Sequence, residues 1–207
     1  MDIESVADLF YARTGKQYLY NITAIDNVSS IIRHGIVCHD YAKRICHYSI
    51  AMEDVQERRS QKSVPNGLRI HQYANLYFSF RNPMMYKRKD LAEDLCILVL
   101  SASVLNIDEC IVSDMNAAAG LVRFYSAAEG MGALDFNRIY AKSWIHPGDD
   151  NETRIHKLIK CAEILIPYAI PFSYVKGAYA VNSDSRDALE RAGFRQRVEV
   201  NSSVFFR

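Results

Sequence analysis

The sequence lacks the short motifs that mark several common classes of protein. Its 207 residues contain no GxGxxG and no GxxxxGK[ST] segment, so neither a Rossmann fingerprint nor a P-loop is present. No HExxH or similar set occurs and the six histidines are scattered, so we expect no metal site. There is no run of about 18 apolar residues, which argues against a transmembrane helix. The acidic start, MDIESVADLF, lacks the layout of a signal peptide. We therefore expect a protein that is neither exported nor held in a membrane.

Cysteine spacing excludes a disulfide framework. The five cysteines are odd in number, far apart and never arranged as CxxC, which also argues against a zinc site. We expect reduced thiols, mostly in the core, and a cytoplasmic location. They are Cys38, Cys46, Cys96, Cys110 and Cys161.

Acidic residues are missing from one long stretch of the chain. The whole protein has a formal net charge of +1, yet Arg58 to Lys89 contains eight Lys and Arg residues and no Asp or Glu. Aromatic residues lie between these cations. A groove with this composition attracts phosphates and offers rings on which bases stack, so we expect a nucleic-acid or nucleotide ligand. The rings are Tyr73, Tyr77, Phe78, Phe80 and Tyr86.

The pattern of apolar and turn residues predicts an α+β fold. Strands and helices alternate irregularly, without evenly spaced βαβ units, which argues against a doubly wound sheet. With 49% apolar and 24% charged residues, the chain has an ordinary globular composition, and 1–207 fits one domain. We expect strands at 18–23, 74–80, 95–101, 162–166, 174–181 and 198–206, and helices at 3–14, 26–35, 50–62, 117–130, 152–160 and 186–192.

Glu163 is the strongest catalytic candidate that the residues themselves suggest. It lies in the apolar segment CAEILIP, which we expect to be a core strand. A carboxylate in such a strand must be paired, protonated or used by a site. The alternative is a structural role, on an exposed edge or paired with Arg154 or Lys160.

Other polar residues have weaker signals. Arg58 and Arg59, in VQERRSQK, either bind an anion or form a solvated helix face that pairs with nearby acids. The segment 20–36, YNITAIDNVSSIIRHGI, predicts a strand, a turn, a helix capped by Asp26 or Asn27, and a stop at Gly35. Such a segment can hold a nucleotide against a helix N-terminus.

Two further polar groups have ordinary structural interpretations. We interpret His71 as a structural or surface residue rather than a base. Asp114 and Asn116 are expected to cap the helix that follows them.

Five segments in this order resemble the DarT family of bacterial DNA ADP-ribosyltransferase toxins. They are YNITAIDNVSSIIRHGI, VQERR, HQYANLYFSFRNPMMY, SDMNAAAGLVRFY and KCAEILIP. The most specific is the pattern H-x-Y-x-x-x-Y-F-x-x-R-x-P-M, from His71 to Met84. The resemblance covers residues 18–207, which leaves no separate domain.

The resemblance implies an ADP-ribosyltransferase fold, a central split sheet flanked by helices whose two parts pinch NAD. The family's catalytic glutamate falls on Glu163, and its second catalytic position, an arginine beside NAD, falls on Arg59. The resemblance also implies cofactor contacts at Asn21, Thr23, Asn27 and Tyr86, and DNA contacts at Tyr73, Arg81, Lys87 and Arg88. Asn21 replaces the family's usual histidine; it can hydrogen-bond a ribose hydroxyl or carboxamide but cannot stack or titrate.

The implied activity is NAD-dependent ADP-ribosylation of thymine or guanine in single-stranded DNA. Breaking the nicotinamide–ribose bond develops positive charge on the ribose. A carboxylate near that ribose either stabilises this charge or takes the proton from the attacking base. The family role is that of a toxin in a toxin–antitoxin or phage-defence system, with a macrodomain antitoxin of the DarG type as partner. Modification of RNA or protein, NAD hydrolysis, and a non-catalytic nucleic-acid-binding module remain alternatives.

Overall fold

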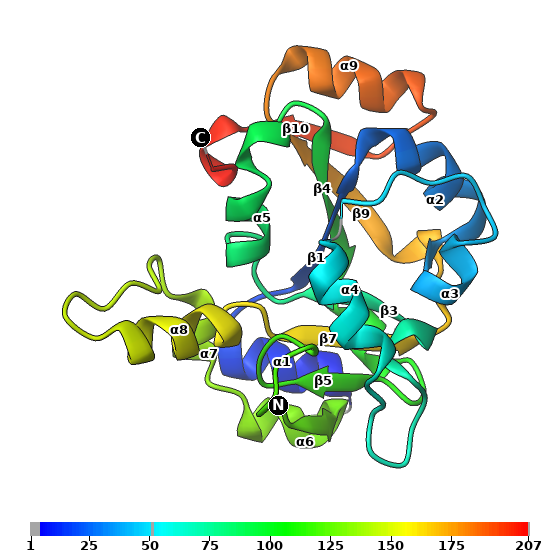
Figure 1. Cartoon of the computed structure of the whole chain (residues 1–207). Helices are drawn as coiled ribbons and strands as arrows, with labels where there is room; N and C mark the ends of the chain where they lie inside the picture. The colour runs from blue at the N-terminus through cyan, green and yellow to red at the C-terminus, as the bar shows by residue number, and fades with distance from the viewer. Residues whose placement is uncertain (1–4, 51, 207) are drawn as a thin grey trace.

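An eight-stranded mixed sheet forms the centre of the computed structural model, which describes residues 5–50 and 52–206 (Figure 1). Its order is β10-β9-β4-β1-β3-β7-β5-β6. The first half contains β10 (Arg197–Val200), β9 (Val175–Ala180), β4 (Leu95–Ser101) and β1 (Tyr18–Ala24). The second half contains β3 (Tyr73–Tyr77), β7 (Glu163–Pro167), β5 (Ile111–Ser113) and β6 (Phe124–Ser126).

The two halves meet through very little strand pairing. β1 pairs with β4 at seven positions and β3 pairs with β7 at five, whereas β1 and β3 pair at Tyr20–Tyr77 alone. Next to this pair, the side chain of Asn21 donates a hydrogen bond of 3.2 Å to the Asn75 carbonyl oxygen. The Asn21 side chain thus gives the Asn75 carbonyl oxygen a hydrogen-bond donor at the point where the two strands diverge. A backbone carbonyl near a protein interior needs such a partner. The expected split sheet is confirmed.

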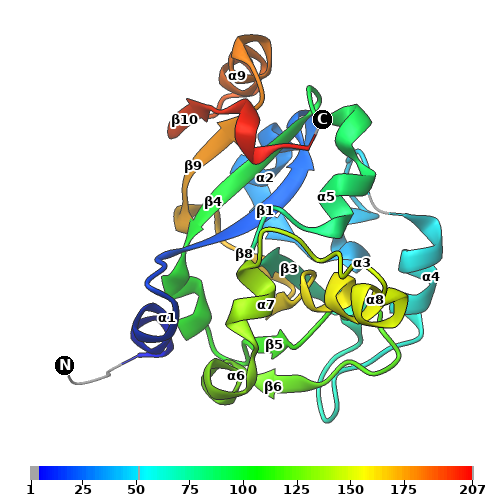
Figure 2. The same cartoon turned by 90° about the vertical axis from the view of Figure 1, so that its left-hand side faces the viewer.

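Helices cover both halves of the sheet. Figure 2 shows α9 beside β10 at one end of the molecule and α6 beside β6 at the other. Near the first half lie α2 (Val28–His34) and α9 (Ser183–Arg191). Near the second half lie α1 (Val6–Thr14), α6 (Ala127–Ala133), α7 (Phe136–Tyr140) and α8 (Asp150–Ile159).

Shorter elements surround the split. They are α3 (His39–Ala42), α4 (Glu53–Ser60), α5 (Pro83–Lys87) and the antiparallel pair of β2 (Ile36–Val37) with β8 (Ala169–Ile170). Single 3-10 turns occupy Ile25–Asn27, Ile70–Gln72, Lys89–Leu91, Ala102–Asn106, Phe172–Tyr174 and Ser202–Val204. In the part of the chain that the structure describes, no helix has the length and apolar character needed to cross a bilayer.

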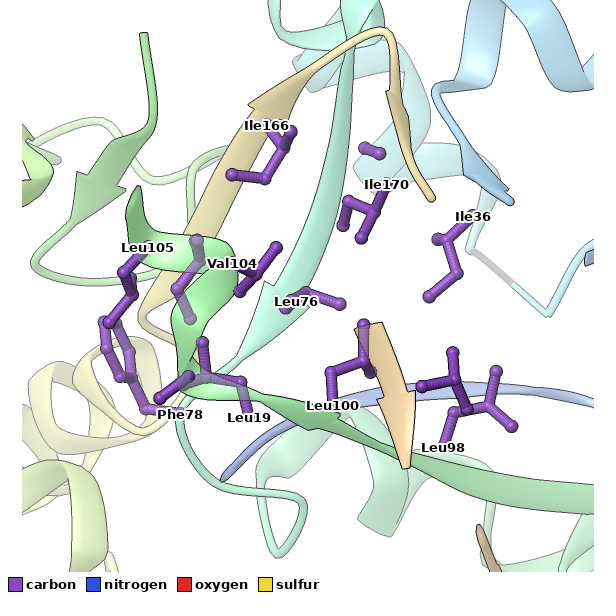
Figure 3. Close-up of a cluster of buried hydrophobic side chains, with 14 of the residues drawn as sticks. Leu19, Ile36, Leu76, Phe78, Leu98, Leu100, Val104, Leu105, Ile166 and Ile170 are labelled. Carbon is purple, nitrogen blue, oxygen red and sulfur yellow. The ribbon is translucent and has the colours of Figure 1, made fainter. Parts of the chain in front are cut away.

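A continuous apolar core compensates for the weak pairing between the halves. Figure 3 shows Leu19 and Leu100 from the first half beside Leu76 of the second. Phe78, which follows β3, packs its ring 5.9 Å from that of Phe10 in α1. Because all of these side chains are fully buried, the core holds both halves together beneath the split.

Gly35 ends α2, as expected. It has φ 77°, and a Cβ there would lie 2.3 Å from the carbonyl oxygen of Ile170, so glycine allows β2 and β8 to approach. At the other end of α2, Asn27 is the N-cap residue, which is one of the two expected positions, but its side chain makes no capping bond. Instead it accepts from the Tyr48 amide at 2.7 Å and donates to the Tyr48 carbonyl at 2.8 Å. It therefore holds the segment around Tyr48 instead of capping the helix.

The predicted helix at 117–130 is wrong except at its end, where α6 begins. Residues 116–122 form turns, in which the Asn116 side chain accepts from the Ala118 amide at 2.8 Å. Phe124–Ser126 then form β6 and pair with β5, so a helix cannot run through these residues. Asp114 and Asn116 therefore cap no helix; Asp114 accepts from the Arg123 amide instead.

The predicted strand at 198–206 extends too far. β10 ends at Val200, because the Asn201 side chain accepts from the Ser203 amide at 3.1 Å and turns the chain. The residues after β10 pack near α5. Arg81 donates to the carbonyl oxygen of Ser203 at 2.8 Å and its guanidinium lies 4.3 Å from the centre of the Phe206 ring.

Replacing Asn82 tests the start of α5. This buried residue accepts from the Met85 amide at 3.0 Å and donates to the Ser79 carbonyl at 3.0 Å. We expect Asn82→Ala to lower the free energy of unfolding by about 1 kcal/mol, with Asn82→Ser, which keeps a capping oxygen, costing less. Urea denaturation measures both. Equal losses for the two variants would contradict the capping role.

Candidate active site

A cavity of about 560 Å³ lies where β1 and β3 diverge. Its walls come from both strands, from α3, α4, α5 and α8, and from the turns at 116–120. Figure 1 shows α4, α5 and α8 around this part of the sheet. Elements far apart in the sequence thus meet at the split, in a space large enough for a small ligand.

The cavity is lined by cations without acids. Among the described residues that line it there is no Asp or Glu, while six cations are present: Arg58, Arg59, Lys87, Arg88, Arg154 and Lys157. A second cavity, of about 470 Å³, has the opposite character, with four acids and no cation among its described lining residues. Those acids are Asp26, Glu93, Asp94 and Asp184. Because like charges repel, a phosphate group is drawn to the first cavity and not to the second.

A buried ion pair connects α4 to β7 at this cavity. Arg59 Nη1 donates to Oε1 and Oε2 of Glu163, at 3.0 and 2.9 Å. Arg59 is 8% exposed and Glu163 is 0% exposed. The structure therefore pairs Glu163 with Arg59 rather than with either of the expected alternatives, Arg154 and Lys160. The Arg59 side chain lines the cavity, with Glu163 directly behind it.

Neighbouring backbone completes the environment of Glu163. The amide of Ala117 donates to Oε1 at 2.9 Å, and the Glu163 amide donates to Oγ of Ser113 at 3.1 Å. Tyr77 is its strand partner, and burial together with the negative charge of Glu163 raises the pKa of that phenol well above its usual value. A charge in this apolar strand is tolerated because each carboxylate oxygen accepts a hydrogen bond.

Four other predicted site residues also line the cavity: Asn21, Tyr73, Lys87 and Arg88. Tyr73 accepts a hydrogen bond of 3.1 Å from the Leu68 amide, and burial raises the pKa of its phenol. Arg88 donates through Nε to the Ile50 carbonyl oxygen at 2.7 Å. The structure thus brings these side chains together with Arg59.

The structure does not bring Thr23, Asn27, Arg81 and Tyr86 into the cavity lining. Thr23 accepts from Asn27 at 3.2 Å, at the end of β1. Arg81 binds the C-terminal residues after β10. Tyr86 is 48% exposed and packs edge-on against Trp144 and Phe206.

Sequence reasoning missed several residues that the structure places in the cavity wall. Arg154 and Lys157 lie one turn apart on α8, a spacing that puts both on one helix face and could have indicated them. His39 and His71 also line the cavity. His71 is 7% exposed, so it is not a surface residue.

Two contacts organise the turns at 116–120. The Ala117 amide binds Glu163, and the ammonium group of Lys62 donates to the Ala119 carbonyl oxygen. The ion pair therefore fixes α4, β7 and one wall of the cavity together. Chemically, the site offers cationic donors for phosphate oxygens and a guanidinium whose orientation is set by a buried carboxylate.

Removing one member of the ion pair tests its structural importance. We expect Glu163→Ala to lower the free energy of unfolding by about 3–5 kcal/mol, because it leaves the Arg59 guanidinium buried without a partner. The double variant Arg59→Ala/Glu163→Ala should lose less than the sum of the two single losses. Urea denaturation gives all three values.

The exposed pair Arg58–Asp54, on the same helix, is the matched control. Asp54→Ala should cost less than about 1 kcal/mol. Additive losses at Arg59 and Glu163 would show that the two residues do not stabilise each other.

Comparison with known proteins identifies the family. The family model described as "ssDNA thymidine ADP-ribosyltransferase, DarT" matches residues 20–206. A DNA ADP-ribosyl transferase from Thermus sp. (strain 2.9) is 30% identical over 169 residues, which cover 76% of this chain and 78% of the relative. A DNA ADP-ribosyl transferase–DNA ADP-ribosyl glycohydrolase fusion protein from Thermosipho africanus (strain H17ap60334) is 26% identical over 182 residues. That match covers 84% of this chain, which spans about half (45%) of the fusion protein.

Solved structures agree with this result. The structure of Thermus sp. 2.9 DarT in complex with ADP-ribosylated ssDNA superposes with a TM-score of 0.77 at 26% identity, covering 92% of this chain and 96% of that one. The structure of the same protein in complex with NAD+ gives a TM-score of 0.73 at 23% identity, covering 92% and 98%. The fold is therefore that of an ADP-ribosyltransferase, and the chain belongs to the DarT family.

Proposed function

We propose that this chain is an NAD-dependent ADP-ribosyltransferase that modifies thymine in single-stranded DNA. The observation that carries the proposal is the buried Arg59–Glu163 pair at the wall of a cavity that has six cations and no acid among its described lining residues. The description of the family supports the DNA acceptor and favours thymine over guanine.

The residues of the cavity fit NAD as a substrate. Its diphosphate carries two negative charges, which suit the cations from α4 and α5. The bonds to Glu163 use Nη1 of Arg59, and a guanidinium has five N–H donors in all, so Arg59 retains donors for a phosphate oxygen. Asn21 presents an amide that donates and accepts, which suits a ribose hydroxyl or the carboxamide.

Electrostatics at the reacting ribose account for catalysis. When the bond between C1′ and the nicotinamide nitrogen breaks, its electron pair leaves with nicotinamide and positive charge develops on the ribose. We infer that the negative charge of Glu163 stabilises that centre and that Arg59 holds the diphosphate beside it. The apolar strand around Glu163 strengthens these interactions by keeping water away.

Cations on two helices suit the DNA backbone. Lys87 and Arg88 belong to the end of α5, and Arg154 and Lys157 to α8, and all four line the cavity. We infer that they bind phosphates on either side of the target nucleotide, with Tyr73 as a ring on which an unstacked base rests. A single strand suits this arrangement because its bases are free to enter the cavity. Roles for Thr23, Asn27, Arg81 and Tyr86 in binding remain predictions.

We also propose the biological setting that the family resemblance suggests. One relative carries a DNA ADP-ribosyl glycohydrolase in the same chain. A macrodomain antitoxin of the DarG type, which removes ADP-ribose from DNA, is therefore the proposed partner of a toxin. A cytoplasmic location belongs to the same proposal, and the five free cysteines agree with it.

Transfer of labelled ADP-ribose tests the proposed function. The protein is incubated with labelled NAD and a single-stranded oligonucleotide that contains thymine, and mass spectrometry locates the adduct. We expect label on thymine, and a rate about 10²–10³-fold lower for Glu163→Gln. An otherwise identical oligonucleotide without thymine, an RNA and a protein mixture are incubated in parallel. Label on RNA or protein alone would assign the activity to another acceptor, and no NAD binding by calorimetry would favour a non-catalytic module.

Salt dependence of DNA binding tests the cations of α8. Lys157→Ala should weaken binding of single-stranded DNA and lower the slope of log affinity against log salt by about 0.7, the value for one phosphate contact. Lys176→Ala is the control, since Lys176 is exposed on β9 and does not line the cavity. Equal slopes for Lys157→Ala and wild type would exclude a phosphate contact at Lys157.

A further inference from the structure

The proposed reaction releases a proton, and the following inference rests on that proposed function. The attacking ring nitrogen of the base carries a hydrogen, which the new bond to C1′ replaces. A group in the cavity must accept that proton for the base to leave as a neutral, modified nucleotide. Proton transfer to a positioned side chain contributes about 10²–10⁴-fold to such reactions.

Glu163 is poorly placed to accept this proton. Its side chain is 0% exposed and is not part of the cavity lining. Both carboxylate oxygens accept from Arg59, and Oε1 also accepts from the Ala117 amide. A proton on this carboxylate would leave Arg59 buried beside a neutral group, which is costly.

Other titratable groups in the cavity wall keep their protons at neutral pH. Burial raises the pKa of the Cys161 thiol to about 12 and raises the pKa values of the Tyr73 and Tyr77 phenols. The side chains of the lining lysines and arginines act as hydrogen-bond donors rather than acceptors. Among the described lining residues this leaves two groups, His39 and His71.

His71 is held in one tautomer. It lies in the turn before β3, and its Nε2 is 3.0 Å from Oε1 of Gln56 on α4. Because the amide oxygen only accepts, Nε2 carries the hydrogen and Nδ1 is the unprotonated nitrogen. The ring of His39 lies against that of His71, with centroids 4.1 Å apart.

The surroundings keep both imidazoles neutral. Burial lowers the pKa of His71 most, and the positive charges of Arg59 and Lys43 lower it further. The negative charge of Asp40 and the hydrogen bond to Gln56 raise it, but the net pKa lies below the ordinary value. Burial also lowers the pKa of His39, to about 4, with His71, Lys43 and His47 acting in the same direction and Asp40 against them. Each ring is therefore unprotonated, and able to accept a proton, at neutral pH.

We propose that His71, packed against His39, accepts through Nδ1 the proton that the target base loses as it attacks C1′ of NAD. The electron pair of the base nitrogen forms the bond to C1′, and the pair of the broken glycosidic bond leaves with nicotinamide. The N–H proton of the base passes to Nδ1. The imidazolium that forms then lies near Arg59, whose charge favours release of the proton to solvent.

The rate of transfer should depend on pH in a defined direction. His71 accepts a proton while it is neutral, so kcat is highest above its pKa and falls as pH decreases through it. Because that pKa lies below the ordinary histidine value of about 6.5, the decrease should occur below about pH 6.5.

Two variants separate proton transfer from positioning. His71→Gln keeps an N–H that can donate to Gln56 but has no basic nitrogen, whereas Gln56→Leu removes the bond and keeps the imidazole. We expect His71→Gln to lower kcat for DNA transfer by about 10²–10⁴-fold, with KM for NAD nearly unchanged and the decrease at acid pH abolished. Gln56→Leu should retain the acid decrease. Imidazole added to His71→Ala should restore part of the rate.

The outcomes distinguish this inference from the function on which it rests. Circular dichroism and NAD calorimetry establish that each variant is folded and binds. A wild-type protein that binds NAD but labels no acceptor overturns the proposed function. A wild-type protein that labels DNA at a constant rate between about pH 4 and 8 overturns the His71 proposal alone. A double variant His39→Gln/His71→Gln with the wild-type kcat also overturns it. The same holds if His71→Gln loses activity only through a raised KM and imidazole does not restore the activity of His71→Ala.

Discussion

The ion pair between Arg59 and Glu163 is the interaction on which the site depends. Two charges removed from water are stable only when their geometry is good and the remaining polar atoms are satisfied. That requirement explains why the Ala117 amide donates to the Glu163 carboxylate, while Ser113 accepts from the backbone amide of Glu163. The pair joins residues 104 positions apart, so it fixes α4 against β7. The cavity wall follows from this attachment.

The split in the sheet supplies the space that the ion pair organises. β1 and β3 share a single pair, Tyr20–Tyr77, beyond which Asn21 replaces a backbone bond with a side-chain bond. A fully paired sheet would leave no cavity there. Buried apolar side chains beneath the split connect the two halves, so these packing contacts remain although the strands diverge. The split sheet is stable because strand pairing holds each half together, while packing of apolar side chains holds the two halves to each other.

Sequence alone predicted the fold class and the position of Glu163 in a core strand, and it indicated a site there because a carboxylate in an apolar strand needs a partner or a function. It did not predict the partner of Glu163, since spacing carries no information about a contact across 104 residues. The helix expected at 117–130 was wrong for a similar reason: Phe124–Ser126 pair with β5, a partner distant enough that helical spacing does not reveal it. Nothing in the sequence indicated the role now proposed for His71, because its burial and its bond to Gln56 are visible only in three dimensions. The assignments of Arg59 and the other site residues came from the family resemblance rather than from periodicity.

The acid-free stretch from Arg58 to Lys89 does not form one patch. Arg59 is buried and paired with Glu163, and Arg81 packs against the C-terminal residues, so neither is simply a surface charge. The positive cavity is completed by α8, which lies outside the stretch. The absence of Asp and Glu from its described lining favours phosphates, but it also means that no carboxylate in that lining can accept a proton. The charge pattern that suits the substrates therefore leaves proton transfer to imidazoles, which accept a proton without carrying a negative charge into the cavity.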